Sequence, residues 1–265
     1  MVKCNKRSKY TYADLIEIMD VLRSENGCPW DKEQDHRSIR KNLIEEAYEV
    51  CDGIDRNDRD AMCEELGDLL LQVVFHAKIA SDEGQFDHLD VTDGICRKLI
   101  FRHPHIFGDV KAGTSAEVLD NWEKLKVQEK QQKTYTETIE QVPACLPGLM
   151  RAQKVQHRAA KAKFDFASPE EAMAKVREET GELAECIGSD PSRAAEEFGD
   201  LLFACVNVGR LLGLDCEEAL TAATDKFARR FAGMESAATQ LGKHLADMQM
   251  PEMDKLWEFI KKKEK

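Results

Sequence analysis

Apolar residues recur every three or four positions along most of this chain, the spacing that places side chains on one face of an α-helix. The first such stretch, 12–23, has its apolar residues at Leu15, Ile16, Met19 and Leu22. The same spacing predicts further helices in the first half at 38–51, 58–83, 91–102 and 116–133. In the second half it predicts helices at 149–161 and 168–186, and helices that begin at Asp190, Asp215 and Met250. No segment alternates as a strand does, so the predicted fold class is all-α.

Breaks between these stretches carry the residues that end or start helices. Asp52-Gly53 is predicted to stop one helix, and Asp58 or Asp60 to cap the next. His103-Pro104-His105 predicts a turn, followed by an irregular segment at 106–113. The polar stretch 135–147 contains two prolines and is interpreted as a linker between two domains, 1–134 and 148–265.

An acidic motif occurs once in each of these halves. The first copy is Glu45-Glu46-Ala47-Tyr48-Glu49 followed by Glu65-Leu66-Gly67-Asp68. The second copy is Glu178-Glu179-Thr180-Gly181-Glu182 followed by Glu197-Phe198-Gly199-Asp200. The offset is 133 positions from Glu46 to Glu179 and 132 from Asp68 to Asp200. Motifs that recur in the same order at a nearly constant offset indicate an internal duplication of a helical bundle.

Each copy is predicted to bring four carboxylates together across a pair of antiparallel helices. Residues three or four apart share a helix face, so the acids of each motif point the same way. Four such charges need a neutralising partner, and oxygen ligands suit the hard cations Mg²⁺ or Mn²⁺. The predicted metal ligands are Glu46, Glu49, Glu65 and Asp68 in the first half, and Glu179, Glu182, Glu197 and Asp200 in the second. Gly67 and Gly199 are interpreted as small residues that allow a close helix–helix approach.

Single acidic motifs of this kind are common on solvated helix faces, and the same holds for basic ones. Lys98/Arg102 and Lys226/Arg230 are basic pairs at i, i+4, downstream of each acidic motif. Their repetition favours binding of phosphate groups over an ordinary basic helix face. Lys175 also lies within reach of such a phosphate, although a solvated helix residue is the simpler interpretation. Trp257 has basic neighbours and is a candidate stacking surface for a base. The alternative is that its side chain packs in the core.

The net charge, the lengths of apolar runs and the cysteine spacing argue against several classes of function. The formal net charge of −12 argues against binding to a nucleic-acid polymer, which needs a basic surface. No apolar run approaches the roughly 18 residues of a membrane span. The nine cysteines show no CxxC pair, which favours reduced thiols in the cytoplasm and argues against zinc.

Carboxylates, a divalent metal and nearby Lys and Arg together favour phosphoryl chemistry. The chain has no P-loop, and no Ser, Cys or His nucleophile has a plausible partner, so attack by an activated water is left. One alternative is a di-iron carboxylate bundle, but the Glu-x-x-His motif that it requires is missing, because Glu49 and Asp68 stand at the third positions. The other is a regulator that binds a metal–nucleotide complex without hydrolysing it.

At this point the chain resembles the MazG nucleoside triphosphate pyrophosphohydrolases in their two-repeat bacterial form. The resemblance rests on both acidic motifs and on four further segments: 25–34 (ENGCPWDKEQ), 102–107 (RHPHIF), 149–154 (LMRAQK) and 225–231 (DKFARRF). It implies a homodimer of helical domains and Mg²⁺-dependent hydrolysis of NTPs or dNTPs to the monophosphate and pyrophosphate, with water attacking the α-phosphorus. House-cleaning of aberrant nucleotides or modulation of a starvation response would be its role.

The resemblance also implies residue roles. The catalytic set would be Glu178, Glu179, Glu182, Glu197 and Asp200, in a C-terminal repeat that is the main catalytic domain, with Glu178 assigned as the base or as an acid beside the metal ligands. The substrate-binding set would be Lys175, Glu178, Lys226, Arg229, Arg230 and Trp257. Family members often carry Gly-Phe-Asp-Trp where this chain has Lys163-Phe164-Asp165-Phe166, which puts base selection by an aromatic residue there in doubt.

Overall fold

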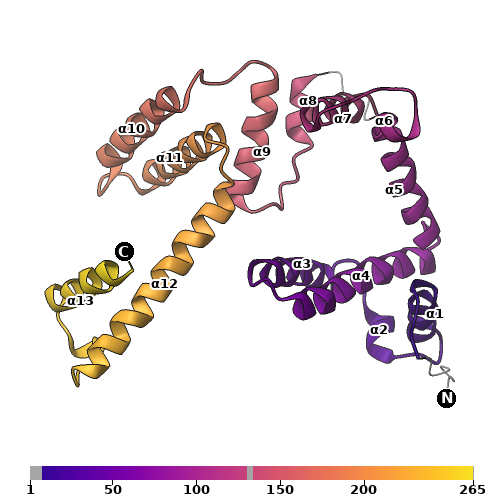
Figure 1. Cartoon of the computed structure of the whole chain (residues 1–265), viewed down its shortest axis with the longest axis horizontal. Coiled ribbons are helices and arrows are strands. Elements are labelled where there is room, and N and C mark those ends of the chain that lie inside the picture. Colours follow the sequence, from indigo (N-terminus) through magenta and orange to yellow (C-terminus); the bar gives the residue numbers. More distant parts are fainter. Residues whose placement is uncertain (1–7, 130–133, 265) are drawn as a thin grey trace. The chain divides into compact units, whose positions relative to one another are not determined.

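The computed structural model describes residues 8–129 and 134–264, and every regular element in these ranges is a helix. The chain divides into two compact units, residues 1–129 and 130–265, each of which is described by itself below. The all-α class and the duplication are therefore confirmed, since each unit contains one long helical hairpin (Figure 1). None of the helices in the described ranges is long and apolar enough to cross a membrane.

The first unit is organised around the hairpin of α3 and α4. Asp58 caps α4 by accepting a hydrogen bond from the amide of Ala61, as one of the two predicted caps requires. Thr11 and Asp87 start α1 and α5 with capping boxes. The helices of this unit are α1 (Tyr12–Arg23), α2 (Pro29–Glu33), α3 (Arg40–Asp55), α4 (Arg59–Asp82), α5 (His88–Arg102), α6 (Pro104–Phe107) and α7 (Ser115–Glu129).

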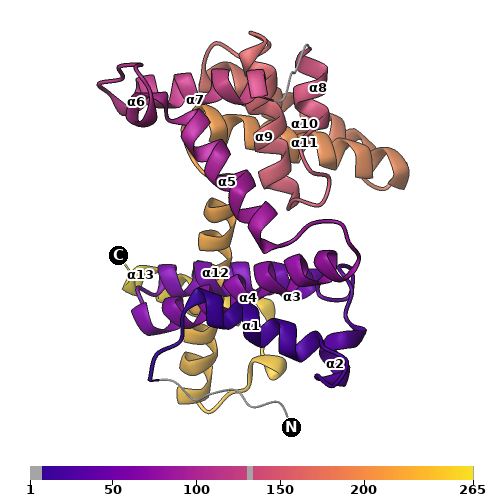
Figure 2. The same ribbon diagram turned by 90° about the vertical axis from the view of Figure 1, so that its right-hand side faces the viewer.

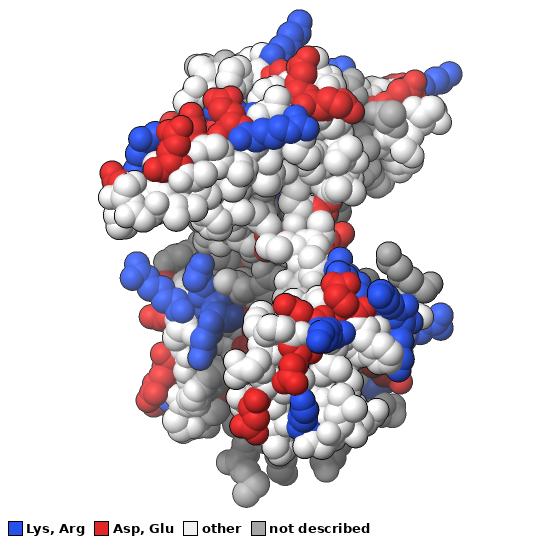
Figure 3. Space-filling model, turned by 90° about the vertical axis from the view of Figure 1, so that its left-hand side faces the viewer, with Lys and Arg blue, Asp and Glu red and all other residues white. Residues whose placement is uncertain are grey.

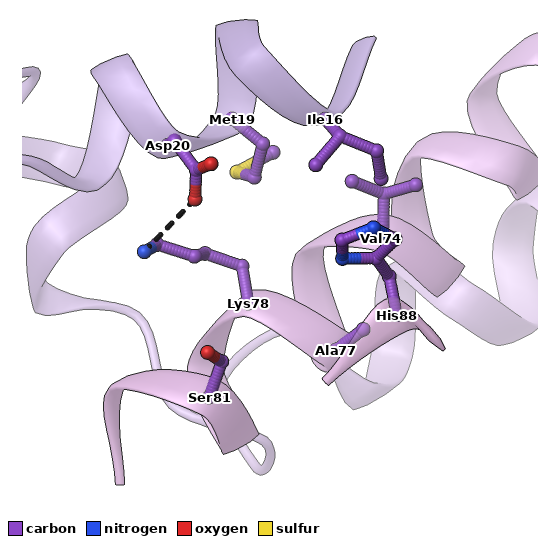
Figure 4. A pocket seen from close by; sticks show the side chains of 8 residues that line it. All are labelled: Ile16, Met19, Asp20, Val74, Ala77, Lys78, Ser81 and His88. Carbon is purple, nitrogen blue, oxygen red and sulfur yellow. Dashed lines mark ion pairs between the residues drawn. The ribbon is translucent and has the colours of Figure 1, made fainter. Parts of the chain in front are cut away.

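A small apolar core joins α1 to the second half of α4 (Figure 2). Its buried side chains are Met19, Ile39, Val74, Phe75 and Ile79. Beside this core lies a cavity of about 30 Å³, lined by residues of α1 and α4 and by His88 at the start of α5 (Figure 4). The ammonium of Lys78 lies there 2.9 Å from a carboxylate oxygen of Asp20, so an ion pair as well as apolar burial holds α1 on α4.

The second unit repeats the hairpin with α10 and α11. Ser168 and Asp190 cap these helices with their side chains, and a proline follows each cap. The elements are α8 (Tyr135–Glu140), α9 (Gly148–Lys161), α10 (Pro169–Cys186), α11 (Pro191–Leu211), α12 (Cys216–Gln240), the short 3₁₀ helix η1 (Leu245–Asp247) and α13 (Met250–Lys263). The segment 135–147, interpreted above as a linker, thus holds α8, which packs against α9.

Gln153 shows how one segment of the family resemblance serves the fold. Its side-chain amide donates to the carbonyl of Leu214 (2.8 Å) and its amide oxygen accepts from the backbone N–H of Cys216 (3.0 Å). These two bonds tie α9 to the turn between α11 and α12, so they set where α12 leaves the hairpin.

Three glycines behave differently from the prediction. Gly53 does not stop a helix: α3 continues to Asp55, and a Cβ on Gly53 would lie 3.0 Å from the backbone nitrogen of Met62 on α4. The close approach between hairpin helices is therefore at Gly53. At Gly67 and Gly199, where we expected it, an added Cβ would meet nothing within 4 Å, because both glycines lie on exposed helix faces.

The predicted irregular segment after the turn at 103–105 is also partly wrong. Pro104 starts the short helix α6, which extends to Phe107 before the chain becomes irregular. Proline is favoured in the first turn of a helix because the amide hydrogen that it lacks would have no helical partner there.

Two carboxylate clusters as candidate metal centres

The two hairpins carry the acidic motifs on helices that pack antiparallel, and each hairpin brings carboxylates from both of its helices together. In the first unit, oxygens of Glu46, Glu49 and Glu65 all lie within 4.8 Å of one another. Burial and the nearby charge of Asp68 raise the pKa of Glu46 above its ordinary value. Asp68 therefore adjoins this first cluster, although it is not among the three residues that converge most closely.

The second cluster has the same plan with a different outlying member. Oxygens of Glu179, Glu197 and Asp200 lie within 4.8 Å of one another. Glu179 is the most enclosed of them, with 4% of its surface exposed. Burial and the charges of Glu197 and Glu179 raise the pKa of Glu182, which places this fourth predicted ligand beside the cluster.

Two cations lie on the second cluster. The ammonium of Lys175 lies 2.5 Å from Glu179 and 2.8 Å from Glu178, and these two hydrogen bonds raise its pKa. The guanidinium of Arg193 lies 3.3 Å from Glu197. Sequence reasoning did not identify Arg193 as part of the site, although its position four residues before Glu197 was a readable signal.

Within residues 8–129, the first cluster has no equivalent of these cations. The positions four residues before Glu46 and Glu65 are Asn42 and Ala61, which carry no charge. Among the residues that the structure describes, no ion pair joins a lysine or arginine to the first cluster. The repulsion within it is therefore uncompensated, and burial together with the charge of Glu49 raises the pKa of Glu65.

Lys175 and Glu178 of the predicted substrate-binding set lie on α10, whereas its other members, Lys226, Arg229, Arg230 and Trp257, lie on α12 and α13. Arg229 and Arg230 both pair with Glu264, and the ring of Trp257 packs 5.2 Å from that of Phe227. Lys226 is exposed on α12. Figure 1 shows α13 along the C-terminal half of α12, whereas α9 and α11 contact α12 nearer its start. No hydrogen bond or ion pair in the described ranges links the group on α12 and α13 to the second cluster.

The matching arginine of the first half is enclosed. Arg102 has 8% of its surface exposed, pairs with Glu129 at 2.7 Å, and lies over the ring of Trp122. His103 packs edge-on against the same ring. Arg102 therefore joins α5 to α7, and Lys98 is the exposed member of that basic pair.

The donor set suits a hard divalent cation in both hairpins. Each cluster offers only carboxylate oxygens, which are the ligands that Mg²⁺ and Mn²⁺ take. Burial and, after it, the charges of neighbouring carboxylates raise the pKa values of Glu46, Glu65 and Glu182, and a cation would relieve that repulsion. On the face drawn in Figure 3, acidic and basic side chains are interspersed, as on an ordinary solvated helical surface.

Comparison with known proteins adds a family to this geometry. The sequence model of the MazG nucleotide pyrophosphohydrolase domain matches residues 34–107 and again 167–232, so each match contains one hairpin with its cluster. Over 254 residues the chain is 44% identical to the nucleoside triphosphate pyrophosphohydrolase of Escherichia coli K12, which covers 94% of this chain and 97% of the relative.

Two further relatives agree with this match. A protein of Thermotoga maritima named nucleoside triphosphate pyrophosphohydrolase/pyrophosphatase MazG is 43% identical over 256 residues, covering 97% of this chain and 98% of the relative. The nucleoside triphosphate pyrophosphohydrolase of Mycolicibacterium smegmatis is 41% identical over 151 residues, covering 56% of this chain and 46% of the relative.

Proposed function

The chain belongs to the family of MazG nucleotide pyrophosphohydrolases, and from that premise we propose that it hydrolyses nucleoside triphosphates, NTPs or dNTPs, to the monophosphate and pyrophosphate. Water attacks the α-phosphorus, the bond from that phosphorus to the bridging oxygen breaks, and pyrophosphate leaves. The observation that carries the proposal is the convergence of carboxylates from two helices in each matched segment. This reaction makes the protein a hydrolase acting on phosphoric anhydrides.

The residues that would hold the metal are Glu179, Glu197 and Asp200, with Glu182 beside them. When bound there, Mg²⁺, or Mn²⁺ as the alternative, supplies positive charge against the phosphate oxygens. Glu178 is the base in this proposal, because its carboxylate lies at the edge of the cluster and contacts Lys175 rather than joining the three converging ligands. Lys175 binds a phosphate oxygen once the nucleotide draws it away from Glu179.

We place the main catalytic activity in the second repeat. Its cluster carries Lys175 and Arg193, two cations that can exchange their carboxylate partners for phosphate groups. The first cluster has no such cation in the described structure. Its α12 carries two arginines, with Arg229 where the first repeat has Phe101. The clamp that we propose for the triphosphate therefore consists of Lys226, Arg229 and Arg230, and Trp257 stacks on the base.

A second copy of the chain completes this proposal as a homodimer. Exposed apolar side chains form a stripe on α11 next to the carboxylates, at Phe198 and Leu202, and the matching stripe on α4 lies at Leu66 and Leu70. Apolar stripes at i, i+4 on an amphipathic helix are suited to packing against another helix. Association also offers a way to bring the group on α12 and α13 to a carboxylate cluster. Light scattering at several concentrations measures the molar mass in solution, which should be that of two chains.

We assign the protein to the cytoplasm, since the eight cysteines in the described ranges are free thiols. Its role there would be to remove aberrant nucleotides or to modulate a starvation response. An alternative is a regulator that binds a metal–nucleotide complex without turnover. The first repeat fits this alternative better than the second, because no lysine or arginine among its described residues pairs with its carboxylates to assist turnover.

One assay with three proteins tests these proposals. Wild type, Glu179→Gln and Glu46→Gln are each given a panel of NTPs and dNTPs with Mg²⁺, and pyrophosphate is measured against orthophosphate. We expect pyrophosphate from wild type and from Glu46→Gln, and a loss of at least about 100-fold in Glu179→Gln. Orthophosphate as the first product would contradict attack at the α-phosphorus. Activity that survives Glu179→Gln and is lost in Glu46→Gln would reverse the assignment of the repeats.

A further inference from the structure

Glu264 bridges the two arginines of the second repeat. One of its carboxylate oxygens lies 3.3 Å from Nε of Arg229, and the other lies 2.6 Å from Nε of Arg230. Hydrogen bonds from Arg230 and Arg229 lower the pKa of this carboxyl group, so it is charged throughout the neutral range. A single side chain at the C-terminal end of α13 therefore sets the spacing of two guanidinium groups on α12.

The first repeat contains the same arrangement. Glu129 follows Trp122 by seven residues and pairs with Arg102, just as Glu264 follows Trp257 by seven residues and pairs with Arg230. Seven residues are about two helical turns, so the tryptophan and the glutamate lie on one face of their helix. A contact that occurs in both copies of the duplication is a property of the repeat, rather than an accident of one surface.

The two copies differ in how far the arginines are enclosed. Glu129 takes both the Nε and an Nη donor of Arg102, and the guanidinium is enclosed under Trp122. Glu264 accepts a hydrogen bond from Nε of each arginine, and in the described structure Arg229 and Arg230 pair with no other residue; their side chains are 66% and 21% exposed. Nη groups supply most of the five N–H donors of an arginine and are the part of the fork that binds phosphate in pairs of bonds.

We propose that Glu264 is a positioning residue for the triphosphate: it holds Arg229 and Arg230 by their Nε atoms and leaves their Nη edges for the phosphate groups. This inference rests on the proposed function for the identity of the ligand. In the first repeat, the equivalent glutamate serves packing alone, because Arg102 is buried. Fixing two flexible arginine side chains before binding reduces the entropy that the nucleotide would otherwise have to overcome.

The test compares Glu264→Gln with wild type in binding and in turnover. The binding probe is α,β-methylene-ATP with Mg²⁺, measured by calorimetry, and AMP is the comparison ligand because it lacks the outer phosphates. We expect Glu264→Gln to weaken the analogue about two- to fivefold, the range that one exposed ionic contact supports, and to leave AMP unchanged. In turnover, KM for the NTP should rise by the same factor while kcat stays as in wild type. Glu264→Asp should recover part of the loss.

Glu252→Gln is the matched control. Glu252 lies on the same helix and pairs with Lys243 at 2.7 Å, but its partner is not one of the proposed clamp residues. This variant should bind the analogue as wild type does. Unfolding midpoints of all the variants should agree within about 3 °C, since each loses one exposed ionic contact.

Three outcomes would overturn the positioning role. They are unchanged or tighter binding of the analogue to Glu264→Gln, an equal loss for the analogue and AMP, and an equal loss in Glu252→Gln. Wild type that binds the analogue but releases no pyrophosphate from NTPs would refute the hydrolase proposal and leave the binding comparison to decide the role of Glu264. Wild type that binds no analogue would refute both.

Discussion

The ammonium of Lys175 lies 2.5 Å from a carboxylate oxygen of Glu179, the most enclosed member of the second cluster. At the matching position of the first repeat, four residues before Glu46, the chain has the neutral Asn42. Lys175 thus pairs with a carboxylate that we propose as a metal ligand. If a metal binds at the second cluster as proposed, it competes with Lys175 for Glu179.

Lys175→Gln should therefore strengthen metal binding without nucleotide and weaken nucleotide binding. We expect affinity for Mn²⁺ to rise about two- to fivefold, because an ion pair of this partly exposed lysine no longer competes. Calorimetric titration measures this affinity in a Glu46→Gln background, in which the first cluster has lost one of its proposed ligands. Lys243→Gln, which removes an ion pair with Glu252, is the control. Unchanged or weaker Mn²⁺ binding would show that Lys175 does not compete for Glu179.

Gly199→Ala should have opposite effects on the single chain and on the dimer. An added Cβ meets nothing within 4 Å, so replacing a glycine inside a helix should stabilise the chain by about 1 kcal/mol. If a second copy packs on the adjacent stripe at Phe198 and Leu202, the same methyl group should weaken association. Urea unfolding and sedimentation over a concentration series separate the two effects.

Gly53→Ala is the contrast for that experiment. Its Cβ would lie 3.0 Å from the backbone nitrogen of Met62, which cannot move without shifting α4. We expect a loss of about 1–3 kcal/mol, as for other overpacked sites. A loss in Gly199→Ala as large as that in Gly53→Ala, measured at concentrations where the chain is monomeric, would contradict the open face at Gly199.

Asp82→Asn should remove a pH-dependent part of the stability of the first unit. Burial acts to raise the pKa of Asp82, but hydrogen bonds from Arg23 and Lys78 outweigh it and lower the pKa below the ordinary 3.8. A lowered pKa means that the contribution is present above 3.8 and is lost as pH falls through the folded-state value. Because 36% of this side chain is exposed, we expect only about 1 kcal/mol at pH 7.

Urea unfolding of wild type and Asp82→Asn at pH 7 and below pH 3 measures this contribution. The difference between the two proteins should vanish at the acidic end. Asp93→Asn is the control, because Asp93 pairs with Arg97 on an exposed surface of one helix and joins no other element. A difference for Asp82→Asn that persists below pH 3 would rule out the ionised carboxylate as its cause.

The titration of His76 should depend on its contact with His36. Their Nδ1 atoms lie 2.8 Å apart, so one ring donates a hydrogen bond to the other and at least one Nδ1 is deprotonated. Burial and the charge of His36 lower the pKa of His76 below 6.5. The stability that the neutral His76 contributes is therefore present above 6.5 and is lost as pH falls below it.

Nuclear magnetic resonance titration of the imidazole signals tests this pairing. In His36→Gln we expect the pKa of His76 to rise but to stay below 6.5, because burial, the larger cause, remains. His157→Gln, in the other unit, should leave the titration of His76 unchanged. A pKa of His76 that does not move in His36→Gln would show that the contact does not hold in solution.

Local signals in the sequence determined most of the helices and both acidic motifs. The limits of α1 and the caps at Asp58 and Ser168 follow from apolar spacing and from side chains that bond to the nearest free amides. The convergence of Glu179, Glu197 and Asp200 was also predictable, because i, i+3 spacing orients the acids and a short connection makes the two helices neighbours. Such features depend on residues within a few turns of each other.

Tertiary structure alone decided what surrounds those features. The sequence shows similar basic pairs in the two repeats, but only packing encloses Arg102 under Trp122, with 9% of its side chain exposed, and leaves 21% of the side chain of Arg230 exposed. It predicted a helix stop at Gly53 and a close helix–helix approach at Gly199, and only the neighbouring helix shows that Gly53 is the crowded position and Gly199 the open one. The physical reason is the range of the interactions: helix spacing and caps are set by adjacent residues, whereas burial and ion pairing depend on segments that are distant in sequence.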